Sequence, residues 1–148
     1  MAKALIQLSN FRPVSTQIKS LQIVSTDTNG FSDLFYFGGS SIVDLYIPGS
    51  NSGTAWVAAD LAVYVCLANG NQGNTSDYAP LYKDDGTQYI IKVPSVPATG
   101  LFIQVNPYDF VGIDAIQFQS VNTAAPGTPV VQTNSPSVTI ITIGNGTF

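Results

Sequence analysis

The sequence predicts an all-β domain, a two-sheet antiparallel sandwich with a jelly-roll-like arrangement of about eight strands and an extended Pro-rich C-terminal segment. Turn-forming pairs such as Asn29-Gly30, Pro48-Gly49 and Asp85-Gly86 recur along the chain, and the segments between them are rich in β-branched and aromatic residues. Glutamate, a strong helix former, is absent. Short strands with long irregular connections favour a sandwich or jelly roll over a meander or a bladed repeat.

The predicted strands occupy the segments between these turns. We expect them at 18–24, 35–37, 42–47, 61–68, 89–93, 101–105, 115–121 and 138–143. The alanine-rich run 55–68 is also compatible with a helix, but Val63 and Val65 favour extended structure in its second half. In 101–105 alternate positions are aliphatic, and Phe102 points the other way, either as an exposed aromatic or on a strand covered on both faces.

The clearest alternation lies in the segment 115–121. Ile116 and Phe118 share one face of the predicted strand, and Gln117 and Gln119 share the other. This pattern predicts that one face packs in the core and that the glutamine face meets solvent.

Three regions are distinguished by composition. Residues 1–121 are predicted to form the β-sandwich domain. Residues 122–137 are rich in Pro, Thr and Ala, which favours an extended linker or arm. Residues 138–148 begin with a strong β segment that either completes the same domain or pairs with a neighbouring molecule.

The chemistry-bearing residues of most enzymes are scarce in this chain. Its 148 residues include no histidine and no glutamate, so acid/base catalysis or a metal site would depend on aspartates. We therefore expect no enzymatic activity, catalytic residue, metal or cofactor. The lone Cys66 lies in an apolar run, where a buried thiol is more plausible than a nucleophile, and it has no second cysteine for an internal disulfide.

Charge and hydropathy also restrict the partners. Charged residues make up 9% of the chain, against roughly 25% in typical soluble domains, and the net charge is −4. No basic cluster is available to neutralise a phosphate backbone, so we expect no nucleic-acid partner. The longest apolar run, 55–68, is too short to span a bilayer, and the N-terminus has too short an apolar stretch for a signal peptide. We therefore expect no membrane partner.

Two aspartate patterns have structural and functional interpretations. Asp84, Asp85 and Gly86 resemble a fragment of a calcium loop, but a type I′ hairpin turn at Asp85-Gly86 explains the same residues. Asp109 and Asp114 could act as a glycosidase pair, but Asp109 follows Asn and Pro in a sequence that favours a turn. The turn interpretation is preferred for both.

Aromatic residues near predicted loops are the better interface candidates, because planar rings stack on sugars and anchor protein contacts. These are Trp56, Tyr78, Tyr82 and Tyr108, each of which could alternatively cap the core. Val138 and Ile140 are added as candidates for strand pairing with a neighbour.

Several segments together resemble virion structural proteins of tailed bacteriophages, most of all head decoration or cement proteins. They are the start 1–4, the Pro/Thr/Ala-rich stretch 123–129 and the run 112–120, which is similar to the late core strand of such proteins. The resemblance implies a homo-oligomer, a dimer or a trimer, that is assembled in the host cytoplasm, binds the outer surface of the head and bridges major capsid proteins. The alternative from the residues is a carbohydrate-binding module or a tail-tip adhesin.

Overall fold

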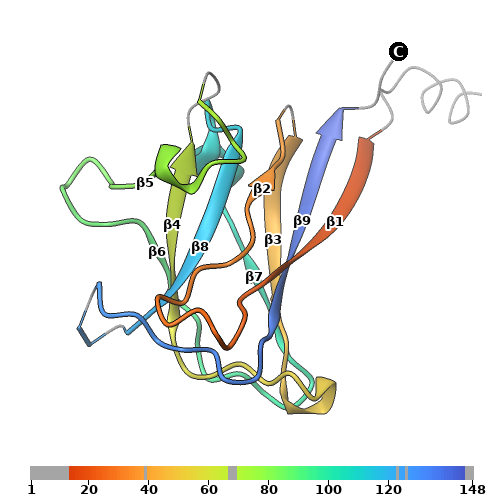
Figure 1. Cartoon of the computed structure of the whole chain (residues 1–148). Coiled ribbons are helices and arrows are strands. Elements are labelled where there is room, and N and C mark those ends of the chain that lie inside the picture. Colours follow the sequence, from red (N-terminus) through yellow and green to blue (C-terminus); the bar gives the residue numbers. More distant parts are fainter. Residues whose placement is uncertain (1–13, 39, 67–69, 123, 126, 146–148) are drawn as a thin grey trace, which may run out of the picture.

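The computed structural model describes residues 14–38, 40–66, 70–122, 124–125 and 127–145 (Figure 1). Within these ranges the secondary structure consists of β-strands and short 3-10 helices, with no α-helix. The strands are β1 (Val14–Gln22), β2 (Phe35–Tyr36), β3 (Ser40–Ile47), β4 (Asp60–Cys66), β5 (Tyr78–Pro80), β6 (Ile90–Ile91), β7 (Leu101–Gln104), β8 (Ala115–Val121) and β9 (Ser137–Asn145). The 3-10 helices are η1 (Ser50–Ser52), η2 (Thr75–Asp77) and η3 (Pro107–Phe110).

The strands form two antiparallel sheets, which confirms the predicted sandwich. One sheet has the order β1-β9-β3-β7, and the other has the order β2-β8-β4-β5 with β6 also paired to β4. With β6 set aside, β1 pairs with β9, β2 with β8, β3 with β7 and β4 with β5. The first strand thus pairs with the last, the second with the one before it, and so on inward, while successive pairs alternate between the two sheets. This is the topology of a jelly roll.

The core lies between the two sheets, where the inward side chains of every long strand meet. Because side chains alternate along a strand, each long strand contributes every second residue. The fully buried members include Leu21, Leu45, Ile47, Leu61, Val63, Ile116, Phe118, Val138 and Ile140.

The predicted solvent face of β8 is buried, which corrects the sequence interpretation. Gln117 and Gln119 are both less than 10% exposed, because the connection between β1 and β2 crosses the outside of this sheet (Figure 1). The Gln117 Nε2 donates to the Ser32 carbonyl at 3.0 Å, and the Gln119 Nε2 donates to the Asn29 carbonyl at 3.0 Å. The glutamines therefore anchor a covering loop, which alternation within one strand cannot reveal.

The connection before β9 packs along the domain. Pro129 forms a β-bridge with Val121, and Gln132 is fully buried. The Gln132 Oε1 accepts from the Val57 N–H at 2.8 Å, and its Nε2 donates to the Val57 carbonyl at 2.8 Å and to the Ser120 Oγ at 3.2 Å. Of the two interpretations of residues 138–148, the structure has β9 completing the same domain between β1 and β3.

Several elements differ from the predicted ones. The strand expected at 18–24 is β1, Val14–Gln22, and β5 lies in a segment for which no strand is predicted. The hairpin at Asp85-Gly86 is present, but Gly86 alone has a positive φ, whereas a type I′ turn needs two such residues. A type I turn closed by the Gly86 N–H and the Lys83 carbonyl at 3.1 Å replaces it. The strand expected at 89–93 shortens to β6, because the Val93 N–H donates to the Asp60 carboxylate at 2.8 Å.

Candidate functional site

Two of the predicted loop aromatics belong to the interior of the protein. Trp56 and Tyr78 are each 9% exposed. The Trp56 Nε1 donates to the Ala59 carbonyl at 3.2 Å, and the Tyr78 hydroxyl donates to the Gln72 carbonyl at 2.7 Å. Their polar atoms are satisfied inside the chain, so neither residue is available to a partner.

The two candidates of the C-terminal strand are also core residues. Val138 and Ile140 have no exposed surface, because β9 turns both toward the opposite sheet. The alternate positions of β9 point outward instead. The strand thus presents Ile141 and Ile143 to the outside, which the sequence could not distinguish because both faces are β-branched.

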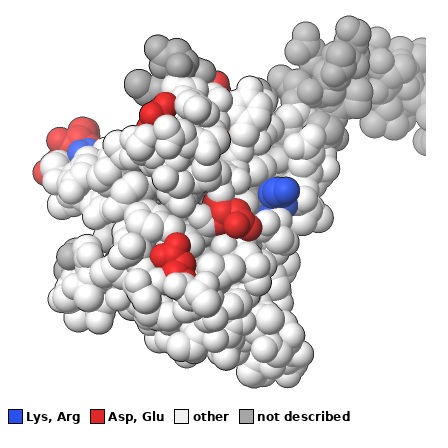
Figure 2. Space-filling model, in the orientation of Figure 1, with Lys and Arg blue, Asp and Glu red and all other residues white. Residues whose placement is uncertain are grey.

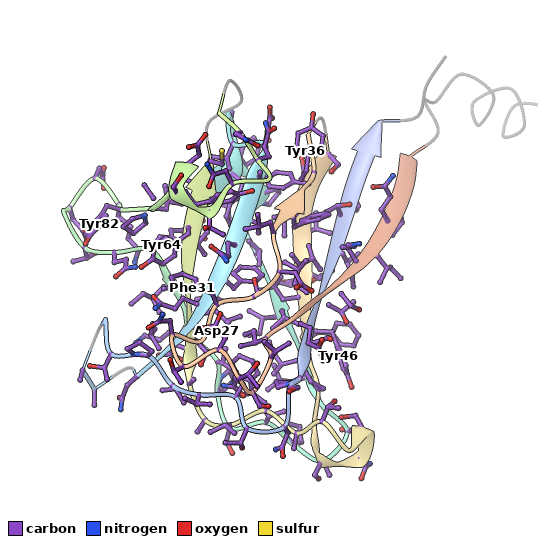
Figure 3. All side chains as sticks on the ribbon, in the orientation of Figure 1. Asp27, Phe31, Tyr36, Tyr46, Tyr64 and Tyr82 are labelled. Carbon is purple, nitrogen blue, oxygen red and sulfur yellow. The ribbon has the colours of Figure 1, made fainter. Side chains whose placement is uncertain are left out.

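Tyr82 and Tyr108 are exposed, as an interface role requires. Tyr82 is 56% exposed and lies in the hairpin after β5 (Figure 3). Tyr108 is 83% exposed and lies in η3. Tyr108 borders the sheet β1-β9-β3-β7, and Tyr82 borders a separate groove. The structure therefore places them at two different surfaces.

The first surface is the outward side of the sheet β1-β9-β3-β7, here called the outward face. Its members, taken from the strand register, are Thr16, Ile18, Ser20, Ser41, Asp44, Tyr46, Phe102, Gln104, Thr139, Ile141 and Ile143. Only Asp44 among them is ionisable at neutral pH. The view in Figure 2 shows the same scarcity of charge over most of the visible surface.

Large apolar side chains lie on this face without a covering element among the described residues. Ile18 is 70% exposed and Phe102 is 66% exposed. The rings of Tyr46 and Phe102 lie 5.0 Å apart, and the Tyr46 hydroxyl donates to the Thr99 carbonyl at 2.8 Å. Of the two alternatives for Phe102, the structure shows the exposed aromatic.

A shallow hollow continues the outward face at its η3 rim. Its volume is about 380 Å³, and its lining includes Val43, Tyr108, Val111 and Ile143. Val111 is 74% exposed, so the rim adds further apolar surface. A β-bulge between Ile42 and Asp44 locally shifts the register of β3 beside this rim.

The second surface is a groove on the other side of η3, here called the tyrosine groove. Two adjoining hollows of about 440 and 340 Å³ form it, and both are lined by Lys83, Tyr89 and Asp109. Tyr82 lines the smaller hollow, and Gln104 the larger. The groove thus combines phenol rings with amide, carboxylate and ammonium groups.

Tyr89 and Asp109 are held together inside the tyrosine groove. The Tyr89 hydroxyl donates to the Asp109 Oδ2 at 2.7 Å, and its ring packs against Phe110 at 5.7 Å. Burial, and then the hydrogen bond to Asp109, raise the pKa of Tyr89 well above its ordinary value. The phenol therefore remains a hydrogen-bond donor throughout the physiological range.

The other candidate chemistry has structural explanations. The Asp85 carboxylate accepts from the Thr87 N–H and hydroxyl at 2.9 and 2.6 Å, and these bonds lower its pKa and complete a turn. Burial, followed by the charge of Asp77, raises the pKa of the Cys66 thiol, which disfavours the reactive thiolate. Within the described ranges, no group of three or more Cys or Asp side chains is arranged to hold a metal.

The outward face contains functional candidates that sequence reasoning missed, chiefly Ile18, Phe102 and Ile141. One sequence signal was present. Small hydroxyl residues and large apolar residues occupy alternate positions of the same strand, as Thr139 and Ile141 do in β9. This signal became informative only when the register placed these positions on one side of a sheet.

Comparison with family models, with curated proteins and with solved structures found no match. No helix in the described part of the chain is long and apolar enough to cross a membrane.

Proposed function

We propose that this chain is a non-enzymatic structural protein of a phage virion, a capsid decoration or cement subunit. In this role it binds the outer surface of the head and bridges major capsid proteins. The observation that carries the proposal is the outward face, on which Ile18, Phe102 and Ile143 remain accessible and Asp44 is the only member of the charged residue types.

The composition of the outward face fits protein contact better than catalysis. The buried centres of protein interfaces are depleted in charged residues and enriched in aromatic ones. The Tyr46 and Phe102 pair provides such an aromatic centre, and small hydroxyl side chains such as Ser20 and Thr139 surround the isoleucines. Removal of this apolar surface from water would drive binding without any strong polar site.

The jelly roll supports the proposal at the level of analogy. Viral capsid proteins and lectins both use this architecture, so the fold alone does not choose between them. A decoration subunit is present in many copies on a repeating shell, so a modest individual affinity is amplified by multivalency. A broad face with weak distributed contacts suits that arrangement.

Truncation of Phe102 is expected to weaken attachment to heads. Phe102→Ser removes an exposed ring at little cost in stability, whereas hot-spot aromatics contribute about 2 kcal/mol or more, roughly 30-fold in affinity. The measurement is cosedimentation of the purified variants with virus heads. The heads come from the virus that encodes the chain and are prepared without this protein.

Tyr36→Ser provides the matched control, because Tyr36 is 63% exposed but belongs to β2 of the opposite sheet. It should bind as the wild type does. If Phe102→Ser and Tyr36→Ser bind heads equally well, the outward face is not the surface that contacts the head. A wild-type content of only a few copies per particle would contradict the cement role itself.

The tyrosine groove supports a second candidate function, a carbohydrate-binding or tail-tip adhesin module. Exposed Tyr82 offers a ring for stacking on a sugar, and Asp109 and Lys83 offer hydrogen-bonding groups beside it. The shared Tyr89 hydrogen bond fixes the orientation of the Asp109 carboxylate. This combination is typical of saccharide recognition rather than of a flat protein contact.

Tyr82→Ala is the test of that alternative. If the groove binds saccharides, the substitution should reduce binding on a glycan array at least tenfold, because stacking of the ring is lost. Tyr108→Ala, which alters an exposed tyrosine of η3 that does not line the tyrosine groove, should leave glycan binding unchanged. Absence of glycan binding by the wild type, or equal loss in both variants, would contradict the groove as a sugar site.

A further inference from the structure

The strand β1 forms a long open edge of its sheet. It has nine residues, whereas the other edge strands, β7, β5, β6 and β2, have four, three, two and two residues. Natural proteins usually protect such an edge with Pro, charges, bulges or a covering segment. Among the described residues only Lys19 places a charge on β1, and its pairing with β9 contains no register shift.

The backbone groups that face this open edge can be identified from the hydrogen bonds at its end. The Ile23 N–H donates to the Pro136 carbonyl at 2.9 Å, so the odd-numbered residues of β1 bond to β9. The even-numbered residues then direct their backbone groups away from β9. Gln22 shows this directly, because its N–H donates to the Asp33 carboxylate at 3.1 Å and its carbonyl accepts from the Asp33 N–H at 3.1 Å.

Among the described residues, Asp33 therefore closes the edge at Gln22 alone. The N–H and C=O groups of Thr16, Ile18 and Ser20 point toward the open side, and their side chains lie on the outward face. Ile18 is the central residue of the strand and is 70% exposed. Ile18 thus combines an exposed side chain with backbone groups that no described residue covers.

We propose that β1 pairs antiparallel with β1 of a second copy of this chain about a twofold axis at Ile18. Ile18 then lies opposite Ile18 of the second copy, and Thr16 lies opposite Ser20 of the second copy. In this register the open N–H and C=O groups of all three residues find partners. The two sheets merge into one, and the outward face becomes continuous across the pair.

The sequence of β1 favours a second copy as the occupant, because it is nearly symmetric about Ile18. Hydroxyl residues lie two positions away on both sides, and Gln17 faces Lys19 of the second copy. In every register the backbone of Gln22 is occupied by Asp33. In the proposed register Gln22 faces Val14, the first residue of β1, whereas a shift of the axis to Lys19 would place Gln22 opposite Thr16 and two lysines opposite each other. In the proposed register Ile18 also lies beside Ile141 in each copy, so a row of isoleucines crosses the axis.

The pairing does not depend on attachment to a capsid, and it is tested on the purified full chain. Sedimentation equilibrium should show a dimer, and Ile18→Lys should weaken it at least 100-fold by opposing two like charges and removing the isoleucine contact. Val24→Lys adds the same charge at an exposed position beyond β1 and should leave the dimer intact. A wild-type monomer, a trimer, or a dimer equally stable in Ile18→Lys would overturn the proposal.

Cysteine substitution tests the register. Residues directly opposite in a hydrogen-bonded pair have Cα atoms about 5.5 Å apart, within disulfide range, so Ile18→Cys should form a linked dimer under mild oxidation. Thr16→Cys should not, because the two copies of this position are displaced along the strands. The native Cys66 is 1% exposed and does not compete. Efficient linkage through Thr16→Cys instead, or no linkage through Ile18→Cys, would overturn the assigned register.

Discussion

Removal of residues 137–148 is expected to abolish folding. The deletion removes β9, which lies between β1 and β3 and contributes Val138 and Ile140 to the core. Without β9, β1 loses its only strand partner among the described residues. Circular dichroism and a urea titration should show an unfolded or aggregated chain with no cooperative transition.

A synthetic peptide added to the truncated chain shows whether the loss of folding is due to the absence of β9 or to another effect of the truncation. A peptide covering Ser137–Asn145 should restore the β-sheet signal of the truncated chain. The same peptide with Val138→Asp and Ile140→Asp should not restore it, because it would bury unpaired charges. A truncated chain that folds cooperatively without peptide would contradict the central position of β9. The deletion consequently cannot serve as a test of capsid attachment.

Replacement of Gln132 by alanine is expected to destabilise the protein by about 2–4 kcal/mol. The substitution leaves the N–H and the C=O of the half-buried Val57 without their partner, and an unsatisfied polar group costs about 1–3 kcal/mol when it is fully buried. It also leaves a cavity where a fully buried side chain was packed. The free energy of unfolding from urea titration measures the effect.

Asn134→Ala is the matched control for Gln132→Ala. Asn134 donates from its Nδ2 to the Ala55 carbonyl at 3.0 Å, so it links the same two segments of chain, but it is exposed. Water can replace that hydrogen bond, and the cost should remain below about 1 kcal/mol. A similar loss in both variants would show that burial of the Gln132 amide contributes little.

The fold was predictable because local patterns and global topology agree in this chain. Residues 115–121 form β8 with the expected bounds, since alternation of Ile116 and Phe118 with glutamines marks the inward face. Turn-forming pairs such as Pro48-Gly49 interrupt the strands where the chain reverses. For the segment expected at 61–68, the structure has β4 ending at Cys66, and positions 67 and 68 lie outside the described residues.

The candidate surfaces were less predictable, because exposure depends on what the rest of the chain covers. Trp56 and Tyr78 stand beside loop-forming residues, but tertiary packing buries both and satisfies their polar atoms. Gln117 and Gln132 are polar, but distant backbone groups make them interior residues. Long-range contacts of this kind leave no local sequence signal.

The pairing of the first described strand with the last determines when the fold can be completed during synthesis. Val14 lies opposite Asn145, so β1 gains its strand partner only after β9 has been synthesised. Such a long loop makes closure entropically costly, and folding dominated by distant contacts is slow. We therefore expect that this sheet closes only after Ser137–Asn145 has been synthesised, as a late step of folding.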